Sequence, residues 1–274
     1  MKLSEDVVES TSQPYMQFSI AGASQEYTSQ KVYVSDAVTK VVGDETYYVF
    51  KCRISARSMA SVIEAQLING NEKSSVYSYT VKDYALYLID HAWDSTEYAA
   101  AKPLALAMLH YGAAAQRQFG STDPPADKYP DDTDIEGNDW ENVTAGVINK
   151  PYDASQASLP EGTEFAGMTL SLKSETTLSL YFISEGTLAF SCEGMSVERS
   201  ESGNYQIARI RGIPSKQLDD TFTVTLGGGY QVSVCPMTYC YNVLSDTTGS
   251  YGDDLKDVVK TLYRYSEEAD AYFQ

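Results

Sequence analysis

A stretch whose hydrophobic period changes from that of a strand to that of a helix occurs twice in this chain of 274 residues. Residues 76–89 (VYSYTVKDYALYLI) first alternate as a β-strand does and then take helical spacing. Residues 232–244 (VSVCPMTYCYNVL) repeat the change, with Tyr239 matching Tyr84 at an offset of 155 (239 − 84 = 155). Each copy predicts a corner at which a sheet leads into a helical hairpin.

The helices expected after the two corners also correspond. Residues 102–119 and 255–273 carry matching apolar stripes, in which Tyr111 aligns with Tyr265. Shorter helices are expected at 81–91, capped by Thr80, and at 236–244. This order predicts an α+β fold with two tandem β-sandwich-like modules, each followed by a two-helix hairpin.

Period-2 alternation predicts the strands of both modules. Those of the first are residues 16–20, 31–34, 47–54, 62–68 and 76–79. Those of the second are residues 168–172, 178–182, 187–192, 205–210, 221–226 and 230–234. The first module lacks a counterpart of the opening hairpin 168–182, which turns at Ser174-Glu175. We expect residues 4–15 or 143–165 to cover the sheet edge this leaves, or failing both a second molecule.

The predicted domain boundaries follow from this pattern. They give a first β module with its helical hairpin at residues 1–120, a connector at 121–164, and a second β module with its hairpin at 165–274. Residues 121–141 hold eight acidic side chains and one lysine, a net charge of −7 (1 − 8 = −7). Residues 121–141 are therefore expected to be a solvated acidic segment, with order of the connector against one of the modules as the alternative.

The charge of the whole chain limits its partners. A formal net charge of −18 repels a phosphate backbone, so no nucleic acid is expected to bind. No apolar run approaches the roughly 20 residues that span a bilayer, and the start carries no apolar segment of signal-peptide length. We expect no insertion into a membrane.

No catalytic signature is present in the sequence. There is no GxSxG elbow, HExxH motif, phosphate loop or dinucleotide fingerprint, so we expect no enzyme and no cofactor. A glycan-cleaving pair of carboxylates stays open as a third class of function. The four cysteines have no zinc spacing and are expected to be free thiols: Cys52, Cys192, Cys235 and Cys240.

One segment of the connector begins as a calcium-binding loop does. Asp132, Asp134 and Glu136 follow the opening of such a loop, but Val143 stands where a bidentate glutamate belongs. A plain acidic linker is favoured over a weak calcium site, and no metal is expected.

Both tryptophans lie outside the repeated pattern, and interface energy concentrates in Trp and Tyr. Specificity is expected where the copies differ, at residues 92–101, 127–142 and 245–252. Hydrophobic plugs that hold the loops are the alternative for Trp93 and Trp140. The candidate ligand-binding residues are Trp93, Tyr98, Tyr129, Trp140 and Tyr152.

Five segments carry a family resemblance: YVFKCRISARSMASVIEAQL, YTVKDYALYL, LALAMLHYGAAAQRQFG, LSLKSETTLSLYF and LYRYSEEADAYF. They resemble a repeated α+β module of large multidomain surface proteins of gut anaerobic bacteria, and the likeness covers most of the chain outside the connector. It implies a secreted or cell-surface location and no catalytic residues.

Together with the aromatic residues, the resemblance predicts a non-enzymatic interaction or adhesion module. The favoured partner is an extracellular or host protein such as immunoglobulin. The alternative is a carbohydrate-binding module of a glycan-degrading system, which needs coplanar aromatic rings, Trp93, Tyr98, Trp140 and Tyr152, around a groove.

Overall fold

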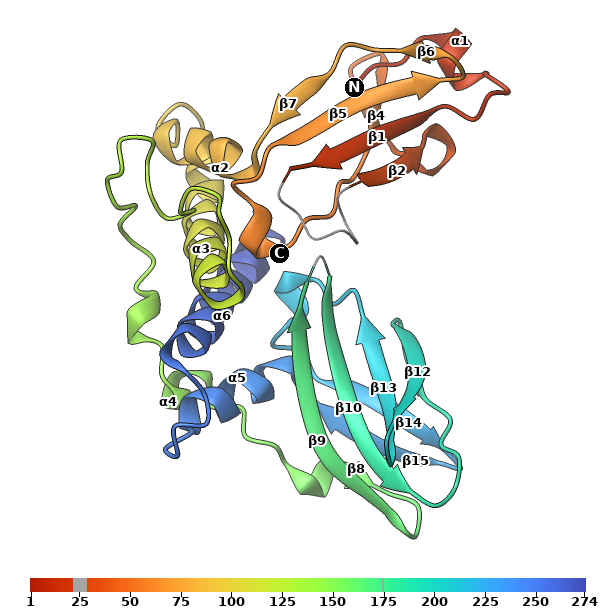
Figure 1. Cartoon of the computed structure of the whole chain (residues 1–274), viewed down its shortest axis with the longest axis vertical. Helices are drawn as coiled ribbons and strands as arrows, with labels where there is room; N and C mark the ends of the chain where they lie inside the picture. Colours follow the sequence, from red (N-terminus) through yellow and green to blue (C-terminus); the bar gives the residue numbers. More distant parts are fainter. Residues whose placement is uncertain (22–28, 174) are drawn as a thin grey trace.

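The computed structural model describes residues 1–21, 29–173 and 175–274. In these ranges the chain is a mixed α+β protein with several antiparallel sheets and six α-helices. One β region lies at each end of the molecule, and the helices run along one side of both (Figure 1). The predicted α+β class is confirmed.

The first β region follows a short helix, α1 (Glu5–Val8). Its strands are β1 (Tyr15–Ile20), β2 (Ser29–Tyr33), β3 (Val38–Val42), β4 (Glu45–Val49), β5 (Ile63–Asn69), β6 (Glu72–Lys73) and β7 (Tyr77–Tyr79). β1 pairs with β2 and β5, and β5 also pairs with β6 and β7. β3 and β4 form a separate two-stranded sheet.

Alternation explains which face of β1 is buried. Met16, Phe18 and Ile20 are buried against Ile63 of β5, while the residues between them face outward. The predicted strands 16–20 and 62–68 are thus confirmed within one or two residues. Gly70, with φ 61°, makes the predicted turn after β5 in the left-handed region that favours glycine.

The predicted strand 47–54 is wrong in its second half. β4 ends at Val49, and residues 50–54 run on without strand pairing. Phe50, Cys52 and Ile54 nevertheless pack against the buried cluster of the first β region. Their spacing of two residues places them on the same side of the extended chain. Alternating apolar and polar residues indicate which side chains are buried. A β-strand also requires a neighbouring strand that shares its backbone hydrogen bonds. The partner of β4 is β3, which the sequence pattern missed because both of its faces are exposed.

The far edge of β4, in the separate β3–β4 sheet, pairs with the start of the chain. The Met1 amino group donates to the Tyr48 carbonyl oxygen at 2.8 Å, and the Tyr48 N–H donates to the Met1 oxygen at 2.8 Å. Lys2 forms a bridge with Tyr47. Beyond β4, the Arg53 N–H donates to the Gln30 side-chain oxygen at 3.0 Å. Within the expected segment 4–15, the Ser10 hydroxyl donates to the side-chain oxygen of Asn69, the last residue of β5, at 2.8 Å.

The second β region contains two four-stranded sheets, β12-β13-β10-β9 and β11-β14-β15-β8. Their strands are β8 (Ala157–Ser158), β9 (Thr163–Leu172), β10 (Thr176–Ser184), β11 (Ser191–Cys192), β12 (Ser196–Ser202), β13 (Tyr205–Arg211), β14 (Phe222–Gly227) and β15 (Tyr230–Val234). The predicted strands are found, except that 187–192 is reduced to the short β11. β12 was missed, and Ser174 of the predicted opening turn lies outside the described residues.

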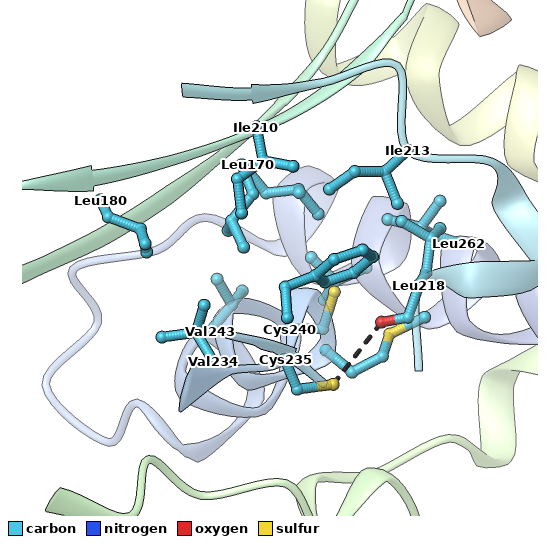
Figure 2. Close-up of a cluster of buried hydrophobic side chains, with 14 of the residues drawn as sticks. Leu170, Leu180, Ile210, Ile213, Leu218, Val234, Cys235, Cys240, Val243 and Leu262 are labelled. Atoms are coloured by element: carbon cyan, nitrogen blue, oxygen red, sulfur yellow. Dashed lines mark hydrogen bonds between the residues drawn. The ribbon is translucent and has the colours of Figure 1, made fainter. Parts of the chain in front are cut away.

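Side chains from both sheets and the C-terminal helices meet in the largest core. Leu170, Leu180 and Ile210 from the β9–β10–β13 sheet point toward Leu218, Val243 and Leu262 (Figure 2). The Cys235 Sγ–H donates to the Leu218 carbonyl oxygen at 3.6 Å, which ties the start of a helix to the segment before β14. Leu178, Leu180 and Phe182 of β10 are fully buried.

Four longer helices accompany the sheets: α2 (Val81–Asp90), α3 (Thr96–Phe119), α5 (Pro236–Ser245) and α6 (Asp253–Tyr272). Thr80 caps α2 as predicted, and Pro236 opens α5. α3 begins six residues before the predicted 102, since the Ser95 hydroxyl accepts from the Tyr98 N–H and Pro103 is tolerated inside the helix. None of the described helices has the length and apolarity needed to cross a bilayer.

The helices α3 and α6 lie side by side and join the two halves of the chain (Figure 1). The rings of Tyr111 and Tyr265 stack with centroids 5.6 Å apart and an interplanar angle of 14°. Arg117 reaches Asp257 of α6 at 3.7 Å. Tyr111 and Ala114 of α3 thereby belong to the same buried cluster as the second β region.

The connector 121–164 is not the solvated segment that its charge suggested. Ala126 and Ile135 are buried in the core beneath α2 and α3, and Val143 and Ile148 are buried in the largest core. These four apolar residues are spaced too widely to give a periodic signal, so charge dominated the prediction. The run AGVI forms the short helix α4 (Ala145–Ile148), not a strand.

Candidate binding surface

The outer face of α2 presents two tyrosines because its inner face is filled. Ala85, Leu86 and Ile89 are buried against α3, at the three- and four-residue spacing of one helical face. Tyr84 and Tyr87 lie on the opposite side and are exposed. The helix thus separates a packed stripe from an aromatic one.

The loop after α2 adds two rings to this face. His91 stacks on Tyr87 with centroids 4.1 Å apart, and its Nδ1 lies 2.9 Å from the Tyr87 carbonyl oxygen. Trp93 is 83% exposed, and its Nε1–H donates to the Asp90 carbonyl oxygen at 2.9 Å. The indole is therefore held in place by a hydrogen bond while its ring remains in water.

The first turn of α3 completes the surface. Tyr98 meets Tyr87 edge to face, with centroids 5.8 Å apart. The neighbouring Tyr87 hydroxyl raises the pKa of Tyr98, with smaller contributions from partial burial and the Glu97 carboxylate. We call these exposed or half-exposed rings the aromatic patch: Tyr84, Tyr87, His91, Trp93 and Tyr98.

A third predicted residue lies at the rim of the patch. The Tyr129 hydroxyl is 3.5 Å from the Asp90 carboxylate, the residue whose carbonyl oxygen holds Trp93. Partial burial, followed by the charge of Asp90, raises the pKa of Tyr129. The structure thus brings Trp93, Tyr98 and Tyr129 to one end of α2.

The other two predicted residues pack elsewhere. Trp140 lies over His110 of α3, with ring centroids 6.3 Å apart, and Tyr152 packs on Phe165 of β9 at 5.1 Å. Both are partly buried. Their contacts fit the plug alternative better than a shared groove with Trp93.

Burial of His110 gives the fold a dependence on pH. Burial lowers the pKa of His110, against the opposing influence of Asp127, Glu141 and the Gly137 backbone. Its Nε2 has no hydrogen-bond partner among the described residues. Between the folded pKa and the unfolded value of about 6.5, only the unfolded chain binds the proton, so acid favours unfolding there.

We therefore expect the wild-type chain to lose stability relative to His110→Gln as the pH falls from about 7 to about 5. Urea unfolding at several pH values measures this difference. The carboxylates titrate in both proteins, so the comparison cancels their contribution. Parallel stability curves for the two proteins would show that burial does not hold His110 neutral.

The candidate calcium ligands face a lysine. The Lys128 Nζ lies 3.0 Å from the Asp134 carboxylate and 3.9 Å from that of Asp132. In the described part of the chain no group of three or more His, Cys, Asp or Glu side chains is placed to hold a metal ion. Val143, at the twelfth position of the loop, is buried.

We expect millimolar calcium to leave the melting temperature of the chain unchanged, because Lys128 already pairs with Asp134 and Asp132 and Val143 withholds the twelfth ligand. The Asp132→Asn, Asp134→Asn variant should behave identically. A calcium-dependent rise that this double variant abolishes would contradict the prediction. Differential scanning fluorimetry with and without a chelator makes the measurement.

The cysteines offer no reactive thiolate. All four are unpaired, and burial raises the pKa of Cys52 to about 11 and that of Cys240 to about 12. At neutral pH both thiols stay protonated, so they act as small apolar side chains. The predicted free thiols are confirmed.

A cavity of about 390 Å³ lies where the two halves of the chain meet. Met59, Met108 and the stacked Tyr111 and Tyr265 line its apolar side. Arg53 pairs with Glu175 across it at 3.2 Å. The described residues that line this cavity include no histidine or cysteine, so they provide no nucleophile activated by an imidazole.

No protein-family model, curated protein or solved structure matches this chain. The resemblance to bacterial surface modules therefore stays a prediction. Three residues of the aromatic patch, Tyr84, Tyr87 and His91, were not among the predicted site residues. The apolar stripe of Ala85, Leu86 and Ile89 could have predicted them. A helix that buries this stripe exposes its opposite face, on which Tyr84 and Tyr87 lie.

Proposed function

We propose that the chain is a non-enzymatic interaction module of an extracellular or cell-surface bacterial protein, with a protein ligand bound at the aromatic patch. Host immunoglobulin is the first candidate ligand, because of the family resemblance. The single observation that carries the proposal is the exposed cluster of rings at the end of α2, with Trp93 83% exposed.

The patch has the properties of an interface anchor. Trp and Tyr dominate the residues that contribute most to protein binding, since they bury a large area and order few rotatable bonds. The hydrogen bond from Trp93 to Asp90 and the contacts of Tyr87 with His91 and Tyr98 restrict the rings before binding. Less conformational entropy is then lost on association.

The proposal includes the tandem modules with the domain boundaries 1–120, 121–164 and 165–274. Corresponding backbone hydrogen bonds support it: Lys82 N–H donates to Met59 O at 2.9 Å, and Met237 N–H donates to Leu218 O at 3.2 Å. The donors Lys82 and Met237 differ by the repeat offset (237 − 82 = 155), whereas the acceptors Met59 and Leu218 differ by 159 (218 − 59 = 159) and each follow a short 3-10 turn. The stack of Tyr111 on Tyr265 joins equivalent positions of the two copies.

The second copy lacks most of the patch, although Tyr239 keeps a ring at the position of Tyr84. At the same offset, Asn242 stands for Tyr87 and Thr248 for Trp93 (242 − 87 = 155; 248 − 93 = 155). The module therefore folds without these rings. Their presence in the first copy is better explained by binding than by packing.

The alternative, a carbohydrate-binding module, rests on the same exposed indole, since sugars stack on flat aromatic rings. The groove expected for it needed Trp140 and Tyr152 beside Trp93, and those two rings pack on His110 and Phe165 instead. A glycan array separates the two functions. Glycan binding that Trp93→Ala removes would favour the carbohydrate class.

Capture of proteins from host serum, with purified immunoglobulin measured in parallel, tests the proposed function. Trp93→Ala should remove a specific capture that Tyr230→Ala, an exposed ring on the second β region, retains. Equal capture by both variants would contradict binding at the patch.

A further inference from the structure

The border of the aromatic patch is acidic. Asp83 and Asp90 flank the two tyrosines on α2, and Asp94 and Glu97 flank Trp93 and Tyr98 in the following turn and helix. All four side chains are exposed. The patch is therefore a set of ring faces surrounded by carboxylates.

These four carboxylates form no ion pair within the described residues. The one lysine of the same helix is turned away, because the Lys82 Nζ donates to the Pro125 carbonyl oxygen at 2.6 Å. Burial lowers the pKa of Lys82. The negative potential over the patch is thus left for a partner to neutralise.

We infer that the partner of the aromatic patch is a cationic protein surface rich in arginine or lysine. This inference rests on the proposed function and names the chemistry of its ligand. A guanidinium group can stack on the Trp93 indole and pair with a neighbouring carboxylate such as Asp94 at the same time. A neutral glycan would leave these carboxylates without a counter-charge, and an anionic partner would be repelled.

An octa-arginine peptide is a suitable probe, with octa-glutamate as its opposite. In a Trp140→Phe chain the fluorescence of Trp93 is the only tryptophan signal. Octa-arginine should shift this emission, and its affinity should fall about 10-fold or more between 50 and 300 mM salt as screening increases. Octa-glutamate should leave the emission unchanged. Calorimetry on the wild-type chain repeats the titration without the Trp140→Phe change.

A chain with a net charge of −18 attracts any polycation, so the location of binding must be tested separately. The local variant is Asp83→Asn, Asp94→Asn, Glu97→Gln. The matched control removes the same three charges from exposed residues elsewhere, Glu161→Gln, Glu185→Gln, Glu193→Gln. We expect about a 10-fold loss of octa-arginine affinity in the local variant and in Trp93→Ala, and less than a 2-fold loss in the control.

Equal losses in the local and control variants, or full affinity of Trp93→Ala, would overturn the inference, because binding would then follow the overall charge. That result leaves the proposed function standing if Trp93→Ala still removes protein capture from serum. Conversely, octa-arginine binding at the patch without any captured protein would count against the proposed function and not against the cationic preference.

Discussion

Leu262→Ala should lower the free energy of unfolding by about 3 kcal/mol, the typical cost of deleting a fully buried leucine side chain. Leu262 is 1% exposed and lies mid-way along α6 in the largest core, facing side chains from the β9–β10–β13 sheet (Figure 2). Its loss leaves a cavity that the paired strands around it cannot close. Urea denaturation followed by circular dichroism measures the change.

Two further variants, one on α3 and one on α6, calibrate this effect. Met108→Ala should cost less, because Met108 is only partly buried beside the 390 Å³ cavity. Leu255→Ala, at the partly buried start of α6, should also cost less. Equal costs for all three variants would contradict the placement of Leu262 at the centre of the core.

Gly112→Ala should destabilise the chain by about 1 to 3 kcal/mol, although alanine favours a helix more than glycine does. A Cβ at this position of α3 would overlap Met59 Sδ and lie 2.9 Å from its Cγ. Met59 is buried, so its side chain would have to leave its packed position and turn into the 390 Å³ cavity that it lines, and the lost packing contacts cost stability. Thermal unfolding of the variant measures the outcome.

Gly146→Ala is the control for this substitution. Its Cβ would lie 3.7 Å from the Thr144 hydroxyl, an ordinary contact, and it sits in the helix α4. We expect no loss and a gain of up to about 1 kcal/mol from helix propensity. A stable Gly112→Ala protein would show that Met59 does not pack against α3 as described.

Local rules predicted the elements that have a strong, one-sided pattern. Thr80 with Asp83, and Pro236 after β15, marked the starts of α2 and α5 because caps act within one turn of a helix. Alternation found β1, β5 and β10 because each buries one face. The residues that determine these helices and strands lie close together in the sequence, so a local pattern is enough to predict them.

The missed elements depend on distant partners. β3 exposes both faces, so no alternation marks it, and its pairing with β4 supplies its order. In the connector, Ala126 is fixed by a remote contact, the Gln116 side-chain oxygen that accepts its N–H at 2.8 Å. A charge count over residues 121–141 cannot detect such contacts.

The candidate binding surface was predictable only in part, because some of its features also depend on contacts between residues that are distant in sequence. Trp93 and Tyr98 were found because they fall outside the repeat, and Tyr129 joins them only through Asp90. Tyr84 and Tyr87 lie on a predicted helix, but their exposure follows from the packing of α2 on α3. Trp140 and Tyr152 have the right residue type, and their own ring contacts account for them.

The most direct test of the central claim is the affinity of the chain for a captured ligand, such as immunoglobulin, by biolayer interferometry. The Tyr87→Ala, Trp93→Ala variant is compared with Tyr205→Ala, Tyr230→Ala, a pair of equally simple ring deletions on the second β region. We expect a loss of affinity of about 10-fold or more for the first pair and of less than 2-fold for the second. Unchanged affinity of the first pair, or an equal loss in both, would contradict binding at the aromatic patch.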